Sequence, residues 1–178
     1  MYKTGELILY GSTGVCRITD IVKRRLTGDS AMGLYYVMKP LYQEVVISAP
    51  VNTDKVFMRP IVTRGEAERL IRTIPSVRAK AFHGVGFRQL AEHYESAIKT
   101  YDCGDLIQML VSIRMKKRLL EQQRRKFGAV DERFMKRAED LLSGELAAAL
   151  DKPRDEVADY IVERVDEGVK QSCDGSTE

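Results

Sequence analysis

The chain contains few of the residues that build metal sites and disulfide frameworks. Its 178 residues include three cysteines, two histidines and no tryptophan. Cys16, Cys103 and Cys173 lie far apart, and no CxxC pair occurs. Because only His83 and His93 are left to complete a ligand set, we expect neither a disulfide framework nor a zinc site. The sequence predicts small, partly buried thiols in a reducing compartment, and no metal or cofactor.

Long hydrophobic runs are also absent. No stretch approaches the roughly 20 uncharged apolar residues that a bilayer crossing needs, and the first residues show no signal-peptide pattern. The composition, 44% hydrophobic and 31% charged, is typical of a soluble globular protein and excludes disordered and collagen-like chains. We therefore expect a cytoplasmic protein of one domain or two small ones.

The sequence also has few motifs that are typical of active sites. The GSTG segment at residues 11–14 lacks the spacing of a phosphate-binding loop and leads into strand-like sequence, so it is typical of a hairpin turn. Neither His83 nor His93 has the signature of a base with an orienting acid. We expect that the protein is not an enzyme. One alternative stays open, an enzyme or structural adaptor that uses the FHGVGF loop at residues 82–87 as a pocket.

The first sixty residues predict a small β-structure, because they are rich in β-branched and aromatic residues and broken by glycines. Five short strands are expected over residues 6–10, 14–23, 34–39, 45–48 and 56–59. Turn residues connect them at 11–14, 27–29 and 52–54. Five strands in so short a segment favour a small barrel, since an open sheet would leave edges to protect or pair.

After Pro60 the apolar period changes to that of helices. Helices are expected over residues 63–71, 87–101, 105–126 and 132–150, with a further one beginning after residue 151. Thr63 and Glu66 have capping-box spacing, Asp102 or Cys103 is expected to cap the third helix, and Gly128 to stop it. Asp131 is expected to cap the fourth helix.

These elements divide the chain into segments of different character. The prediction is an α+β protein of two domains, with a β-barrel at residues 1–62 and an all-α domain at 76–170. Residues 63–75 would form a short helix and linker ending near Pro75, and residues 171–178 a frayed tail.

Charge is distributed unevenly along the chain, although the formal net charge is only +3. Residues 114–126 hold seven basic residues and one acid, whereas residues 151–178 hold four basic and nine acidic residues. A basic helix face is a candidate phosphate-binding surface, although most such runs are simply solvated. The residues predicted to contact DNA phosphates are Arg114, Lys117, Arg118, Arg125, Lys136 and Arg137.

Several segments in this order resemble one family. They are residues 5–10 (GELILY), 14–21 (GVCRITDI), 35–39 (YYVMK) and 52–59 leading into TRGEAERLI, followed by GDL at 104–106 and the basic run. The chain resembles the CarD and CdnL family of bacterial transcription regulators, whose N-terminal module is shared with the transcription-repair coupling factor. The resemblance implies a Tudor-like domain that docks on the RNA polymerase β subunit. It also implies a helical domain that contacts promoter DNA and alters open-complex stability.

The predicted polymerase-binding residues surround an expected edge strand at residues 45–48, which could extend a sheet of the partner. They are Arg24, Arg25, Lys39, Val45, Val46 and Ile47. The resemblance places Arg24 near a family position that favours polymerase, while Arg25 and Lys39 would add charge complementarity. The alternative is that Val45 and Ile47 point into the core and that Arg24 is a solvated strand-end charge.

Two departures from the family pattern are visible. The family's Tyr-Pro-x-x-Gly turn is here YGSTG at residues 10–14, which loses proline's rigidity. Many members carry a tryptophan wedge at the start of the first long C-terminal helix, and alignment places Leu90 there, with Phe87 and Phe82 nearby. Leucine and phenylalanine also serve as minor-groove wedges, but are more often core residues.

The sequence therefore predicts a monomeric transcription regulator that binds the polymerase β subunit and promoter DNA, without contact with a membrane. The main alternative is a polymerase-independent, non-specific nucleic-acid-binding protein.

Overall fold

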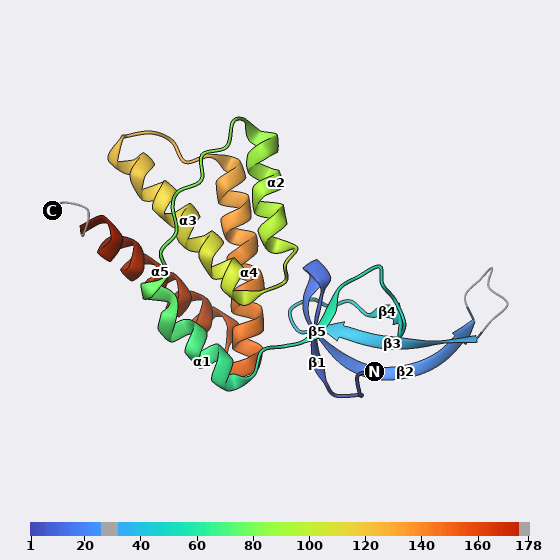
Figure 1. The fold of residues 1–178 in the computed structure, drawn as a ribbon. Coiled ribbons are helices and arrows are strands. Elements are labelled where there is room, and N and C mark those ends of the chain that lie inside the picture. The colour runs from blue at the N-terminus through green and yellow to red at the C-terminus, as the bar shows by residue number, and fades with distance from the viewer. Residues whose placement is uncertain (26–31, 175–178) are drawn as a thin grey trace. The chain divides into compact units, whose positions relative to one another are not determined.

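The computed structural model describes residues 1–25 and 32–174, and the chain divides into two compact units, Met1–Val62 and Thr63–Glu178. Strands form the first unit and helices form the second (Figure 1). The predicted class, a small β domain followed by a helical domain, is confirmed.

The N-terminal unit is a five-stranded antiparallel sheet with the strand order β4-β3-β2-β1-β5. The strands are β1 (Leu7–Tyr10), β2 (Gly14–Arg25), β3 (Met32–Pro40), β4 (Ile47–Pro50) and β5 (Met58–Pro60). A bulge between Ile18 and Asp20 shifts the register of β2 on β3 and bends β2. Among the described residues no ladder joins β4 to β5, so these two strands are the edges of the sheet.

Two strands begin two residues later than the sequence pattern predicts. β4 begins at Ile47 and β5 at Met58, each two residues after the expected start. Val45 and Val46 precede β4 and are exposed. The sequence pattern includes them in the strand, because a run of valines looks the same in a strand and in an extended connection. The turn expected at residues 27–29 lies outside the described residues.

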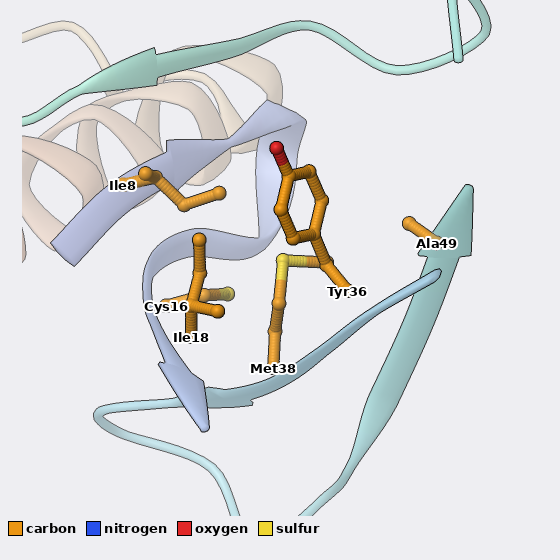
Figure 2. Packing of buried hydrophobic residues seen from close by; sticks show 6 residues of the cluster. All are labelled: Ile8, Cys16, Ile18, Tyr36, Met38 and Ala49. Carbon is orange, nitrogen blue, oxygen red and sulfur yellow. The ribbon is translucent and has the colours of Figure 1, made fainter. Parts of the chain in front are cut away.

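The core of the sheet is built from alternate residues of four strands. Figure 2 shows its buried side chains, which are Ile8, Cys16, Ile18, Tyr36, Met38 and Ala49. The Tyr36 hydroxyl accepts a hydrogen bond from the Tyr2 backbone N–H at 2.8 Å, and the Tyr2 hydroxyl donates to the Met58 carbonyl at 3.2 Å. The chain start is thereby fixed across β3 and β5.

Gly11 opens the turn between β1 and β2, where the family pattern has proline. Its φ is +46°, which proline's ring forbids, and its N–H donates to the Phe57 carbonyl at 2.9 Å. A Cβ here would lie 2.9 Å from Val56 Cγ1. Glycine therefore allows the turn to pack directly on the segment before β5. This contact, instead of a proline ring, makes the turn rigid.

The helical unit contains five α-helices in its described residues. They are α1 (Arg64–Thr73), α2 (Phe87–Ile98), α3 (Cys103–Gln122), α4 (Ala129–Leu150) and α5 (Arg154–Asp174). The helices α3, α4 and α5 pack on one another. The expected capping box of Thr63 and Glu66 is present, and Asp102 caps α3 by accepting from the backbone N–H groups of Gly104 and Asp105.

The connection between α3 and α4 differs from the sequence expectation. α3 ends at Gln122 instead of Lys126, and Arg124 follows with a φ of +54°. Gly128 does not stop α3 but is the residue before α4. Asp131 is not the cap of α4: it lies in the first turn and is 2% exposed, because its carboxylate binds side chains of two other helices.

The segment predicted to link two domains packs as part of the helical unit. α1 contacts α4, and a 3₁₀ turn at Ile74–Ser76 contacts α5. Gly168 of α5 approaches so closely that a Cβ would lie 2.8 Å from the Pro75 carbonyl oxygen. The division therefore falls after Val62 and not at Pro75. At the other end, α5 continues through Asp174, past the expected start of fraying at residue 171.

Candidate functional site

The outer edge of β4 presents unpaired backbone groups. The Val51 N–H donates to the Leu34 carbonyl at 2.9 Å, and the ladder then pairs Ala49 with Tyr36 and Ser48 with Val37. Because hydrogen-bonded and non-hydrogen-bonded pairs alternate in an antiparallel ladder, the backbone of Ser48 points away from β3. The described residues supply no ladder partner on that side. The edge therefore offers donors and acceptors to another strand.

Three of the predicted polymerase-binding side chains are exposed beside this edge. Val45 and Val46, just before β4, are 47% and 70% exposed, whereas Ile47 is half-buried and packs on the core of the sheet. Arg24 is exposed on β2, and its Nη1 donates to Ser48 Oγ at 3.4 Å. The structure thus brings Arg24 next to the edge strand.

The other two predicted cations lie elsewhere on the sheet. Arg25 ends the described part of β2, opposite Met32. Lys39 pairs with Arg17 in the β2–β3 ladder and forms an exposed ion pair with Glu44 at 3.3 Å. At about 3.3 Å per residue, the Lys39 position lies roughly 20 Å along the ladder from Arg24. Arg25 adjoins Arg24, whereas Lys39 follows Met38, the ladder partner of Ile47, and so lies near Val45 and Val46.

Sequence reasoning missed an apolar patch at the far end of the β2–β3 ribbon. Met32 and Leu34 are 59% and 41% exposed and line a hollow of about 590 Å³ together with Tyr35, Pro50 and Val51. Alternation could have found the first two, because they continue the row of the buried Tyr36 beyond the end of the core.

In the helical unit, two of the predicted DNA-binding arginines hold helices together. Arg114 of α3 is 17% exposed, and its Nη2 donates to Glu139 Oε1 at 2.8 Å while its Nη1 lies 3.6 Å from Asp166. Arg137 of α4 donates to Glu95 of α2 at 2.8 Å. Arg114 therefore joins α3 to α4 and α5, and Arg137 joins α4 to α2. Both arginines thus serve the packing between helices.

The remaining predicted cations stay on the surface. Lys117 and Arg118 line a hollow of about 290 Å³ between α3 and α5, and Lys117 Nζ lies 5.6 Å from the Phe127 ring centroid. Arg125 is exposed in the α3–α4 connection, and Lys136 is exposed on α4. Within the described residues none of these four cations forms an ion pair. The exposed Arg124 and Lys126 on either side of Arg125 were missed as individual contacts, although the basic run contained them.

The three candidates for an apolar wedge differ clearly in their exposure to solvent and their contacts. Leu90 is 7% exposed and belongs to the core, which corrects its assignment as a DNA contact. Phe87, one turn earlier, is 79% exposed, and the preceding Val85 is 91% exposed. Phe82 stacks on His93 with ring centroids 3.7 Å apart. Phe87 is therefore the apolar side chain that α2 presents to solvent at its start.

A buried polar cluster joins three helices. The Tyr94 hydroxyl donates to Asp131 Oδ1 at 2.6 Å, and Lys116 Nζ donates to the same oxygen at 2.9 Å. Burial, together with the hydrogen bond to Asp131, raises the pKa of Tyr94 far above its ordinary value. Lys116, a cation of the basic run that is absent from the predicted contacts, is thereby buried within the unit.

The described residues contain no group of three or more histidine, cysteine or acidic side chains placed to hold a metal ion. Burial raises the pKa of Cys16 to about 11, which keeps the thiol protonated at neutral pH. Burial also lowers the pKa of His93 from its usual 6.5. Phe82 and His93 line a hollow of about 680 Å³ between α2 and α3, whereas His83 lines a separate one.

Comparison with known families identifies the β unit. Residues 2–62 match the model of the CarD-like/TRCF RID domain. The N-terminal unit is a CarD-like/TRCF RID domain. This membership supports an RNA polymerase-interacting, transcription-related role for the chain. The edge strand β4 and its neighbour Arg24 both lie inside the matched RID domain.

The match ends at Val62, where the RID domain gives way to the helical unit. No curated protein matches the chain. Among the described residues no helix combines the length and apolar character of a membrane span.

Proposed function

We propose that this protein regulates transcription initiation. It binds the RNA polymerase β subunit through its RID domain and contacts promoter DNA through its helical unit, which alters the stability of the open complex. It acts in the cytoplasm as a monomeric binding protein without catalytic activity. The observation that carries the proposal is the RID domain itself, with one sheet edge available for pairing.

Docking on the β subunit uses the edge of β4. A strand of the partner adds to the sheet through the outward-facing backbone of Ser48, and main-chain hydrogen bonds supply affinity. The exposed Val45 and Val46 extend the contact with apolar area, and Arg24 adds charge complementarity at the same edge. Arg25, next to Arg24, and Lys39, near the start of β4, contribute through the wider field of the domain.

DNA contact uses surface cations of the helical unit. Lys117, Arg118, Arg125 and Lys136 neutralise phosphates without reading bases, and Phe87 offers an apolar side chain for the minor groove. Affinity for free DNA is weak, because the complex depends on tethering to polymerase at a promoter, which raises the effective concentration of DNA.

The proposal is tested by titrating the full-length protein against the isolated β-subunit lobe. Ser48→Pro removes the outward N–H without removing a hydrogen bond to β3, so it is expected to weaken binding at least tenfold. Ser48→Ala keeps that N–H and loses only the contact to Arg24, and it is the matched control expected to stay within threefold of wild type. Equal affinities of Ser48→Pro and wild type would exclude pairing at this edge.

The second candidate function is polymerase-independent binding of nucleic acid, which the unpaired surface cations favour. It predicts no binding to the β-subunit lobe together with salt-dependent binding to duplex DNA of any sequence. The same titration, repeated with DNA in place of the lobe, separates the two functions.

A further inference from the structure

The helices α1 and α5 enclose a groove that the proposed polymerase and DNA contacts do not use. Its volume is about 710 Å³, within the range of ligand-binding clefts. Apolar residues from both helices line it, among them Ile71, Val157 and Tyr160. Tyr160 is 47% exposed, so an aromatic ring is available on the groove wall. Arg164 Nη2 donates to the Arg72 carbonyl at 3.2 Å and fixes α5 against α1.

The rim of this groove carries an acidic row. Asp155, Asp159 and Glu163 recur every four residues on α5, all three are exposed, and Asp159 and Glu163 line the groove itself. Residues four apart lie on one helix face, so the row follows the groove. In the described part of the chain none of these three acids has an ion-pair partner.

The cations of the rim are largely neutralised by neighbours. Arg64 pairs with Glu68 at 3.1 Å, Lys152 with Glu156 at 2.9 Å, and Arg164 with Glu167 at 2.8 Å. Arg72 lines the groove as well, and no ion pair to it is found among the residues described. The unpaired charge around the groove is therefore predominantly negative, in agreement with the excess of acids in residues 151–178.

We propose that this groove docks a basic, amphipathic segment of a partner protein. The apolar residues of that segment enter beside Tyr160, while its lysines or arginines meet Asp155, Asp159 and Glu163. A groove between two helices accepts a third helix through apolar side chains at helical spacing. Nucleic acid does not fit, because unpaired carboxylates repel phosphates. The docking is independent of the RID domain's contact with polymerase.

The test uses full-length protein and a fluorescein-labelled 14-residue peptide with leucine on one helical face and lysine on the other. A matched probe carries glutamate in place of every lysine. At 0.15 M salt the lysine peptide is expected to bind and the glutamate peptide not to bind. Backbone amide signals of the isotope-labelled protein should shift in α1 and α5.

Variants locate the site. The double variant Asp159→Asn/Glu163→Gln is expected to weaken binding about three- to tenfold, the scale of two exposed ion pairs. Tyr160→Ala should weaken it about tenfold, because aromatic residues dominate such contacts. The control Glu121→Gln/Glu132→Gln changes net charge equally, at exposed acids of α3 and α4 outside the groove, and should leave affinity unchanged.

Equal losses in the groove and control double variants would mean that the peptide responds to net charge, and the proposal would be wrong. Amide shifts confined to other helices would overturn it too. If Tyr160→Ala unfolds the protein, seen as lost helical circular dichroism, the exposed charge variant decides. Sedimentation that shows a dimer dissolved by the peptide would assign the groove to a second copy instead. Failure to bind polymerase leaves each of these outcomes unaffected.

Discussion

Lys116 Nζ lies 2.9 Å from both carboxylate oxygens of Asp131, and neither side chain is more than a tenth exposed. The pair joins α3 to α4, and the Tyr94 hydroxyl brings α2 to the same carboxylate. A single acid therefore fixes the mutual position of three helices. The basic run at residues 114–126 therefore divides into two cations that join helices, Arg114 and Lys116, and several that lie on the surface.

Removal of this acid is expected to destabilise the helical unit strongly. Asp131→Ala leaves the buried Lys116 without its partner, which typically costs about 3–5 kcal/mol of unfolding free energy. Tyr94→Phe loses one hydrogen bond to a charged group, at about 1.5–3 kcal/mol. Urea unfolding followed by circular dichroism measures both. A loss below about 1 kcal/mol in Asp131→Ala would show that the pair does not hold the helices together.

Reversal of charge at Arg24 is expected to abolish binding to the β-subunit lobe while leaving the fold intact. Arg24 is exposed, and its one side-chain hydrogen bond among the described residues goes to Ser48 Oγ, so Arg24→Glu costs the fold little, yet it places a negative charge at the docking edge. Lys55→Glu, an exposed charge reversal in the loop before β5, is the matched control and should bind normally. Co-purification of Arg24→Glu with the lobe at wild-type yield would remove Arg24 from the interface.

Two arginines of the basic run should behave differently when replaced by glutamine. Arg125→Gln is expected to reduce the salt dependence of DNA binding by about 0.9 in the slope of log K against log salt, with stability unchanged. Arg114→Gln should instead cost about 2 kcal/mol of stability, because it removes charged hydrogen bonds to α4, and should leave the slope nearly unchanged. DNA titrations at several salt concentrations and urea unfolding separate the two effects. The reverse pattern would restore Arg114 as a DNA contact.

Phe87 and Leu90, one helical turn apart, provide a similar contrast. Phe87→Ala should change stability by no more than about 0.5 kcal/mol, since the ring is exposed, but should shorten open-complex lifetime in a promoter assay. Leu90→Ala opens a cavity in the core and should cost about 2–5 kcal/mol. An unchanged open-complex lifetime in Phe87→Ala would exclude the wedge.

Alkaline pH is expected to destabilise the RID domain through Cys16. Burial raises the pKa of this thiol from its ordinary 9.0 to about 11 in the folded state. Between these values the unfolded chain has lost the proton and the folded chain keeps it, so the free energy of unfolding falls as pH rises. The total change is about 2–3 kcal/mol. Urea unfolding at pH 8 to 11 should show this decline in wild type and a smaller one in Cys16→Ala. Equal declines would mean that Cys16 does not ionise on unfolding.

The order of elements was predictable from sequence, because alternation, capping residues and glycines act locally. The capping box of Thr63 and Glu66 and the cap at Asp102 both appear where their spacing indicates. The same local signals failed at Asp131. An acid near a helix start has the signature of a cap, but its burial depends on Lys116 and Tyr94, which are distant along the chain.

The candidate site was only partly predictable for the same reason. The charge run identifies cations but does not tell which ones meet acids after folding, and Glu139, Asp166 and Glu95 come from three different helices. Likewise, the alignment position of Leu90 carries no information about which face of α2 packs inward. The edge strand was located to within two residues, yet the direction of the Ser48 backbone required the register of the ladder.

The close approach of Gly168 to Pro75 has a consequence for synthesis on the ribosome. The 3₁₀ turn at Ile74–Ser76 finds its packing partner only when α5 has been made, whereas every strand of the RID domain precedes Val62. At translation rates of about 5–20 residues per second, the interval between the two is roughly 5–20 s. The RID domain is thus complete, with its β4 edge accessible, while the helical unit is still emerging.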